Sequence, residues 1–230
     1  EGRSDLNQCC INLSEMFRNQ GLDQVKVVSA RNLHLYPGAS YHCEFMFQGQ
    51  KNLVNIPKTL PLGSYFRFYD ERGRVNSTCA YMFYGCESLT NASVQITGDV
   101  LGDGNNSMGH FEGMFAECTS LITPPELPFT SLKPYCYSYM FQHCTSLAAA
   151  PELNAEMPAE GCYQYIFDGC SSLWQIKCLL AHRQAPYCTK YWVRGVGTEG
   201  QFTYNTACKS WTLYGVHTVP YQWEFIPYSA

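Results

Sequence analysis

The chain has 230 residues and a net charge of -4; 46% of its residues are hydrophobic and only 15% are charged, against about 25% charged in an average soluble domain. No basic run is present that could follow a phosphate backbone, so we expect no nucleic-acid binding. The apolar stretches extend over only a few residues, well short of the roughly 18 to 20 that a membrane-spanning helix needs. We therefore expect a soluble chain without a transmembrane segment.

The first segment, residues 1–78, repeats only loosely. A degenerate copy, SEMF, begins at Ser14, and a second copy, FMFQGQKNL, begins at Phe45. Long breaks such as residues 61–76 interrupt the pattern. Because the terminal repeats of a solenoid are usually atypical, we expect this segment to form irregular N-terminal rungs or a small cap module.

Residues 79–190 contain the regular repeats. The best copies are CYSYMFQHCTSLAAAPEL, from Cys136, and CYQYIFDGCSSLWQIKCL, from Cys162. The Met or Ile that opens each core falls at Met114, Met140 and Ile166, which are 26 residues apart. Self-similarity at such a period indicates a repeat architecture. The remaining segment, residues 191–230, is expected to form a β-rich C-terminal cap.

Each copy predicts one short helix and one short strand. In the first copy Cys136, Met140 and Cys144 form an i, i+4, i+8 apolar stripe, which is typical of a helix. Pro151 ends the helix, and an extended segment covers Leu147–Leu153, with equivalents in the copies before and after. Units this small bury their apolar faces only by stacking. The predicted fold class is therefore α/β, a leucine-rich-repeat-like solenoid of short helices and short parallel strands.

The positions predicted to face the core recur in columns along the stack. They are Met82, Cys86, Met114, Cys118, Met140, Cys144, Ile166 and Cys170, together with Leu121, Leu147 and Leu173. Cysteines in such columns behave as small hydrophobic residues, so we expect buried thiols. Cys9, Cys10, Cys178 and Cys208 lie outside the columns and are the first places to expect a disulfide. No closely spaced Cys and His set is present, so we expect no metal site.

The repeat also carries a family resemblance. MFxxCxSL, followed by an APEL or PPEL segment and CYxxMF, resembles the BspA-like leucine-rich-repeat surface proteins of anaerobic gut and oral bacteria. The resemblance covers residues 79–225 and includes a closing segment similar to YWVRGVGTEGQF. It implies a surface-exposed protein, often anchored as a lipoprotein, that takes part in adhesion. The resemblance also implies an extracellular or cell-surface location. Because the chain begins with Glu1 and not with Met, we expect that a leader or an expression tag was removed, together with any targeting signal.

Aromatic side chains form the first candidate binding surface. A tyrosine or phenylalanine directly precedes most Met-column positions, so stacking should align these rings in a ladder. Aromatic rings suit both protein partners and sugars, and Tyr offers contact area at a low entropic cost. The alternative is that the rings merely pack on one another. The aromatic candidates are Tyr81, Tyr137, Tyr139, Tyr163, Tyr165 and Tyr191.

Two acidic side chains form the second candidate. Glu126 and Glu152 occupy equivalent places in successive copies, each just before an inward Leu, and should point outward about 5 Å apart. They could bind a cation or a basic partner, although two solvated glutamates are the common outcome. The next copy places Cys178 there, which would end the column.

The sequence favours binding over catalysis. None of the motifs HExxH, GxSxG or GxxxxGK[ST] occurs, so we expect neither an enzyme nor a cofactor. Extended solenoid surfaces suit macromolecular partners. The leading hypothesis is an adhesion protein that binds a host or bacterial surface protein, the alternative is a protein that binds a polysaccharide, and a hydrolase is a distant third.

Overall fold

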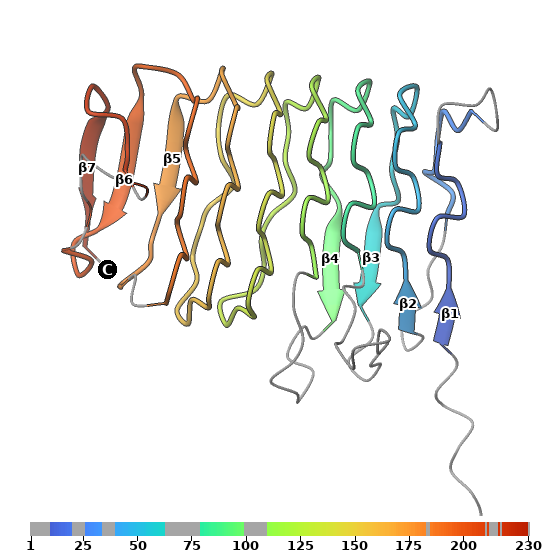
Figure 1. The fold of residues 1–230 in the computed structure, drawn as a ribbon, viewed down its shortest axis with the longest axis horizontal. Helices are drawn as coiled ribbons and strands as arrows, with labels where there is room; N and C mark the ends of the chain where they lie inside the picture. Colours follow the sequence, from blue (N-terminus) through green and yellow to red (C-terminus); the bar gives the residue numbers. More distant parts are fainter. Residues whose placement is uncertain are drawn as a thin grey trace, which may run out of the picture.

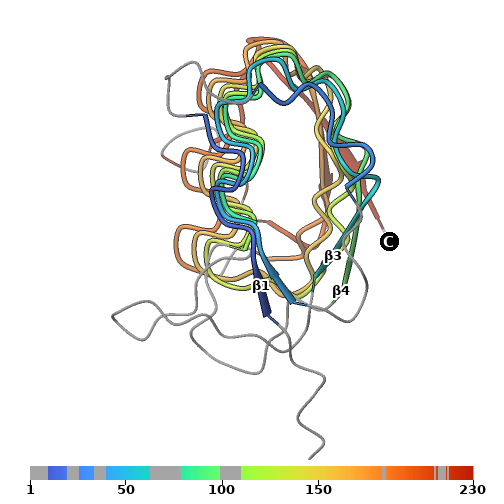
Figure 2. The same ribbon diagram turned by 90° about the vertical axis from the view of Figure 1, so that its right-hand side faces the viewer.

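The computed structural model describes residues 10–19, 26–33, 40–62, 79–98, 110–182, 185–209, 211, 216 and 218–229. The chain forms one elongated stack of coils, advancing in a single direction (Figure 1). Viewed along the stack, each coil has two long walls of different character (Figure 2). One wall undulates because it consists of consecutive turns, and we call it the turn wall. It comprises residues 14–19, 44–50, 80–88, 110–120, 134–146, 160–172 and 186–195. The opposite flat wall carries strands β3 to β7.

Every strand pairing in the described residues is parallel. The sheets are β1 (Cys10–Asn12) with β2 (Ser40–His42), β3 (Thr59–Leu62) with β4 (Gln95–Gly98), and β5 (Gln175–Cys178) with β6 (Gln201–Asn205) and β7 (Glu224–Tyr228). Between β4 and β5 the described residues of the flat wall are joined by isolated bridges, such as Asn91 with Thr123 and Ala149 with Gln175. Of the predicted strand segments, only the one at residues 173–179 contains a strand.

The predicted α/β class is wrong, because the described residues contain no helix. The segment expected to be helical in the copy from Cys136 is a run of overlapping turns. The N–H groups of Ser138, Met140 and Gln142 each donate to the carbonyl three residues earlier, over 3.1, 3.3 and 3.0 Å. The intervening N–H groups, from Tyr137 and Tyr139, instead donate to Cys162 and Gln164 of the next coil, over 3.0 and 2.9 Å. A helix would have kept all these bonds within its own segment.

Every fourth residue of the turn wall has a left-handed backbone. In one coil these residues are Tyr135, Tyr139 and His143, with φ of 57°, 57° and 58°. A left-handed residue reverses the direction of the chain after each turn, so the wall undulates without closing into a helix. The four-residue spacing of the apolar stripe follows from these four-residue turns. The stripe was mistaken for a helix because i, i+4 contacts occur in both structures.

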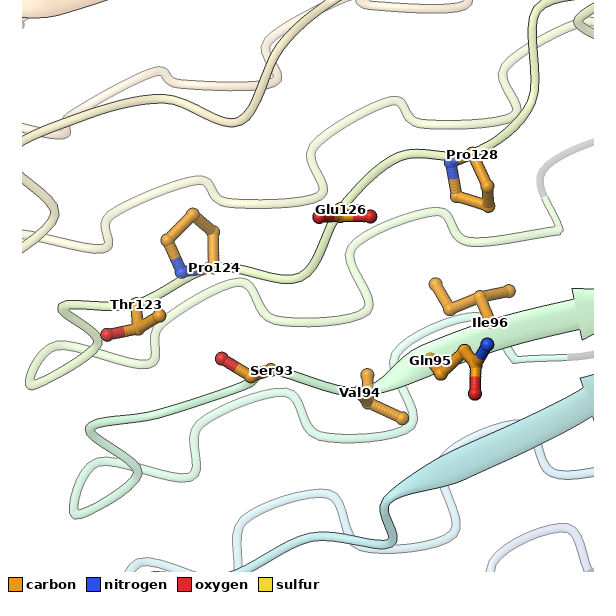
Figure 3. A pocket seen from close by; sticks show the side chains of 8 residues that line it. All are labelled: Ser93, Val94, Gln95, Ile96, Thr123, Pro124, Glu126 and Pro128. Atoms are coloured by element: carbon orange, nitrogen blue, oxygen red, sulfur yellow. The ribbon is translucent and has the colours of Figure 1, made fainter.

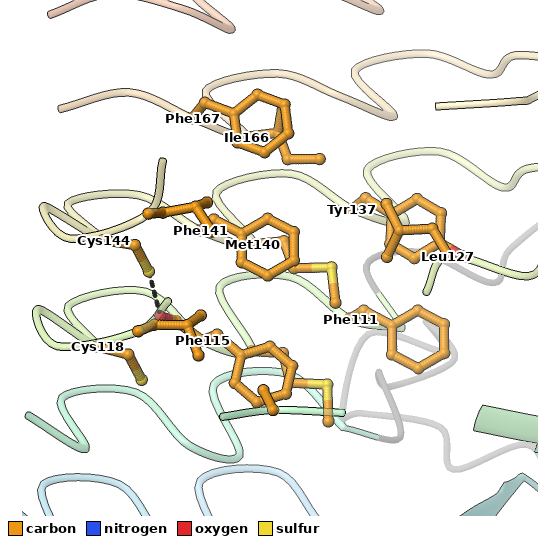
Figure 4. Close-up of a cluster of buried hydrophobic side chains, with 14 of the residues drawn as sticks. Phe111, Phe115, Cys118, Leu127, Tyr137, Met140, Phe141, Cys144, Ile166 and Phe167 are labelled. Carbon is orange, nitrogen blue, oxygen red and sulfur yellow. Dashed lines mark hydrogen bonds between the residues drawn. The ribbon is translucent and has the colours of Figure 1, made fainter. Parts of the chain in front are cut away.

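Identical positions of successive coils stack into continuous columns inside the molecule. All eleven side chains predicted for the core are fully buried, at 0% exposure. A phenylalanine column runs beside them, with ring centroids 5.3 to 6.0 Å apart (Figure 4). Its members are Phe17, Phe47, Phe83, Phe115, Phe141 and Phe167. The column passes through the loosely repeating N-terminal coils, which therefore share the architecture of the regular ones.

The cysteines of the core also act as hydrogen-bond donors. The thiols of Cys118, Cys144 and Cys170 donate to phenylalanine carbonyls of the preceding coil over 3.1, 3.1 and 2.9 Å. In an earlier coil Gln50 takes the same position, and its amide donates to the Phe17 carbonyl over 2.6 Å. Each side chain in this column donates a hydrogen bond to a phenylalanine carbonyl of the preceding coil, which an aliphatic side chain of similar size could not do.

No disulfide joins the described cysteines. Cys178 and Cys208, where a bridge was considered, are both buried and form no disulfide. Cys9 lies outside the described residues, and the side chain of Cys10 is not described.

We predict that the thiols of the column are unreactive in the folded protein. Burial raises the pKa of Cys118 to about 12 and that of Cys144 well above its ordinary value, so the nucleophilic thiolate is scarce. Iodoacetamide should leave Cys118, Cys144 and Cys170 unmodified in the native protein and modify all three in urea, as read by peptide mass spectrometry. Modification of the native column, or disulfide-linked peptides from it, would contradict the structure.

A second prediction concerns acid stability. His110 is only 8% exposed, and burial, followed by the charge of Lys133, lowers its pKa from 6.5 to about 4. The imidazole of His110 therefore takes up a proton more readily in the unfolded chain than in the folded one. The free energy of unfolding is highest above pH 6.5, where His110 is neutral in both states, and it falls as the pH drops from 6.5 towards 4. The lowering of the His110 pKa corresponds to a loss of about 3 kcal/mol in the free energy of unfolding. Urea denaturation at pH 7 and pH 4.5 should show a smaller loss of stability in His110→Gln than in the parent chain; equal losses would refute the assignment.

Candidate binding surfaces

Three predicted tyrosines form a stacked ladder on the turn wall. The ring centroids of Tyr139 and Tyr165 lie 4.8 Å apart with planes 9° from parallel, and those of Tyr165 and Tyr191 lie 5.2 Å apart at 32°. All three side chains are half-buried. Their φ angles are 57°, 56° and 53°, so each occupies a left-handed position of its coil. We call Tyr139, Tyr165 and Tyr191 the tyrosine ladder.

An arginine borders the tyrosine ladder. The Arg194 guanidinium lies 5.4 Å from the ring centroid of Tyr165 and 5.5 Å from that of Tyr191. It also forms two 2.7 Å bonds to the carboxylate of Asp168, which accepts a further 2.9 Å bond from Gln142. Burial alone would raise the pKa of Asp168, but the bonds from Arg194 and Gln142 outweigh it, and the pKa is lowered. A charged Asp168 therefore holds Arg194 against the rings.

Tyr81, which was also predicted for this column, does not join the tyrosine ladder, because the coil between them has Gly113 at the equivalent left-handed position. The Tyr81 ring packs over Gly113, where a Cβ would lie 2.3 Å from its Cε1 atom. Its hydroxyl donates to Glu112 Oε1 over 2.8 Å. Burial, followed by the Glu112 charge, raises the pKa of Tyr81. Tyr81 instead stacks on Phe45 of the preceding coil, at 5.4 Å.

The same tyrosine and glycine arrangement recurs further along the stack. Tyr135 packs over Gly161 and donates to Glu160 Oε1 over 3.0 Å. On the turn wall, both Glu-Gly pairs therefore mark a place where a ring of the preceding coil packs over the next coil. Glu112 and Glu160 precede the two glycines, a signal that the sequence analysis did not use.

We predict that Gly161→Ala destabilises the fold more than Gly195→Ala does. Both glycines are left-handed, with φ of 58° and 74°, so both substitutions share a backbone cost of about 1 kcal/mol. Only at Gly161 would the new methyl group clash, 2.4 Å from Tyr135 Cε1; at Gly195 the nearest atom is 3.5 Å away. Thermal denaturation should show the difference, and adding Tyr135→Ala should recover part of the loss. Equal losses in the two single variants would contradict the ring packing.

Tyr137 and Tyr163, which were also predicted to bind, lie in the core. Both are fully buried and stack on each other at 6.0 Å, and Tyr137 stacks on Phe111 at 5.4 Å. They precede the buried Ser138 and the half-buried Gln164. Burial removes their rings from the surface available to a partner, because two neighbouring residues of every four turn inward.

The two glutamates lie on the flat wall, as part of a hollow of about 350 Å³ between their coils. Glu126 and Glu152 are both exposed. The acidic column ends after Glu152, but the residue at the next position is Lys177 and not Cys178 as predicted. Cys178 pairs in register with Leu153, and Lys177 reaches Glu152 with a 2.6 Å contact between Nζ and Oε2. The coil of Lys177 is one residue shorter here, so the sequence offset of 26 no longer holds.

A larger groove opens beside this hollow. It encloses about 600 Å³ between Ser93–Ile96 of one coil and Thr123–Pro128 of the next (Figure 3). The groove begins where the bridge between Asn91 and Thr123 ends. Pro124, Pro125 and Pro128 have no N–H group to donate. The two coils therefore stop pairing at this point, although their turn walls remain joined.

An exposed apolar column runs along the corner between the two walls. Val28 follows the half-buried Val27, and every other member follows the buried Leu of its coil. Backbone bonds such as Trp174 N–H to Ala148 O, 3.0 Å, join neighbouring coils. Four members, Val28, Val54, Ile122 and Trp174, are between 41% and 60% exposed. We call these four, with Thr90 and Ala148, the apolar ridge. The sequence analysis missed it because its residue types vary between copies.

Neither a cluster of metal ligands nor a membrane-spanning helix occurs in the described residues. They contain no group of three or more His, Cys, Asp or Glu side chains placed to hold a metal ion. Among the same residues no helix is long and apolar enough to cross a bilayer.

Comparisons with known proteins identify no relative. No family model matches the sequence, and neither the curated proteins nor the solved structures contain a match. The resemblance to BspA-like proteins therefore rests on the repeat motif alone.

Proposed function

We propose that the chain is a binding protein that presents the tyrosine ladder to a protein partner. The observation that carries this proposal is the packing of Tyr139, Tyr165 and Tyr191 into one ladder, with Arg194 held over two of its rings by Asp168. Tyr and Arg are enriched among the residues that dominate interface energies. Side chains fixed before binding lose less entropy when a partner arrives.

The stacking of the rings favours a protein over a polysaccharide. In the tyrosine ladder the ring faces are turned towards one another, so a sugar cannot lie flat on them. The three side chains are only half-buried, and their neighbours cover the ring faces, so the exposed part is ring edge, which suits the polar and apolar atoms of a protein. The apolar ridge supports the same class of partner, because exposed apolar patches commonly mark protein interfaces.

We place this activity on the cell surface or outside the cell. This part of the proposal rests on the resemblance of the MFxxCxSL repeat to the BspA-like surface proteins. The partner is then a surface protein of a host or of another bacterium.

The test combines a partner screen with a ladder variant. Arrays of extracellular-matrix proteins and of glycans would be probed with the purified chain, and the affinity for each ligand measured by biolayer interferometry. We expect a protein ligand, and we expect the triple change Tyr139→Ala, Tyr165→Ala and Tyr191→Ala to weaken its binding at least about thirtyfold. Tyr221→Ala, which removes a ring that is 74% exposed elsewhere, should leave the affinity unchanged.

Three results would count against the proposal. Binding to glycans only would replace the partner class. Unchanged affinity in a triple variant with an unchanged melting temperature would remove the tyrosine ladder from the binding surface. If the triple variant melts much earlier, Tyr191→Ala alone, at the end of the ladder, serves in its place, and unchanged affinity there has the same meaning.

A further inference from the structure

We propose that the groove between Ser93–Ile96 and Thr123–Pro128 is a second binding site, which takes an extended cationic peptide segment of a protein partner by adding it as a strand to β4. The site lies on the flat wall and shares no residue with the tyrosine ladder. Its failure would therefore leave the proposed function untouched.

The backbone of β4 has an open edge along this groove. Gln95 faces β3, because its N–H group donates to Lys58 O over 2.9 Å and it pairs in register with Thr59. In a parallel strand the N–H and C=O groups of alternate residues point to opposite sides. Those of Ile96 therefore point away from β3 and into the groove. In the part of the chain that the structure describes, no hydrogen bond crosses from 93–98 to 124–130.

The coil opposite cannot close this edge. Thr123 faces the coil of β4, because its N–H group donates to Thr90 O and its carbonyl accepts from Ala92 N–H. By the same alternation Pro125 holds the next position that faces this coil, and proline has no N–H group. An edge with alternating donors and acceptors is complementary to an extended polypeptide, which carries the same alternation. At about 3.3 Å per residue, the lining residues Ser93–Ile96 run for about 13 Å. Val94 N–H already donates to Ala92 O over 2.6 Å, so Ile96 N–H is the donor that this stretch offers to a peptide. The volume of about 600 Å³ lies in the usual range of ligand sites.

The C-terminal end of the stack shows how an exposed sheet edge is protected. In β7, Glu224 N–H donates to Gly200 O and Tyr228 O accepts from Thr206 N–H, so both residues face β6. Pro227, between them, therefore faces outward, where it offers no donor. Proline on a sheet edge is a common protection against strand addition. β4 has no proline at its outward position, Ile96.

The charge of the groove selects the occupant. Glu126 is exposed at its rim, and no ion pair of the described residues includes it. The neighbouring Glu152 is already paired with Lys177. A peptide with Lys or Arg facing Glu126 would complete the pairing, so we assign a cationic segment to this site.

The first experiment reads the edge itself. In the free, 15N-labelled protein the Ile96 amide should exchange with deuterium much faster than the Gln95 amide, because only the latter is bonded. The probe is an N-acetylated, C-amidated heptapeptide of alternating valine and lysine, at millimolar concentration. We expect it to slow exchange at Ile96 at least about tenfold. An Ile96 amide that is already protected in the free protein would overturn the proposal.

The second experiment separates strand addition from non-specific attraction. The same heptapeptide with every second amide N-methylated should lose binding, because it cannot donate to the edge. Glu126→Gln should weaken binding up to about fivefold, the range of an exposed ion pair, whereas Glu156→Gln, at an exposed glutamate outside the groove, should have no effect. Ser93→Trp should block the groove, and Gln175→Trp, on the same wall, should not. Equal binding of both peptides, or no binding of either, would overturn the proposal.

Discussion

Hydrogen bonds between alternate backbone amides of successive coils hold this molecule together. On the turn wall every second N–H group donates a hydrogen bond to a carbonyl of the next coil, and the others donate within their own coil and close its turns. The carbonyl groups divide in the same way: in the coil from Tyr135, Tyr137 O and Tyr139 O close turns within the coil, whereas Cys136 O and Ser138 O accept from the preceding coil. This division requires the chain to reverse direction every four residues. The left-handed residues at that spacing are the consequence.

The side chains follow from this backbone. Because every coil repeats the same reversals, equivalent side chains stack directly on one another, and aromatic residues gain continuous ring columns. A left-handed non-glycine residue costs about 1 to 2 kcal/mol. The packing of Tyr165 between two neighbouring rings, and of Tyr135 over a glycine, offsets that cost where the residue is aromatic. The residues of the tyrosine ladder, which we propose as the binding surface, are therefore also residues that the backbone requires in a left-handed conformation.

The stacking of the coils could be predicted from the sequence, whereas the turns within each coil could not. The offset of 26 residues predicted the stacking, because a solenoid repeats its sequence once per coil. It failed to predict the turns: Cys136, Met140 and Cys144 satisfy both a helix and a four-residue turn, and only the next coil decides which amides remain free. Tyr137 and Tyr163 were placed outside because the helix interpretation gave no reason to bury two adjacent residues. The partner of Glu152 was missed because the coil of Lys177 is one residue shorter, and the groove because it arises from absent N–H groups.

The direction of the bonds between coils also has a mechanical meaning. They run along the length of the stack, so a force that pulls the two ends apart loads them one coil at a time and not all together. Each regular coil that peels away releases about 26 residues, about 90 Å of extended chain, in exchange for about 5 Å of stack. A tether with this construction lengthens in steps under load and gives way gradually, which suits a molecule that must hold two moving bodies together.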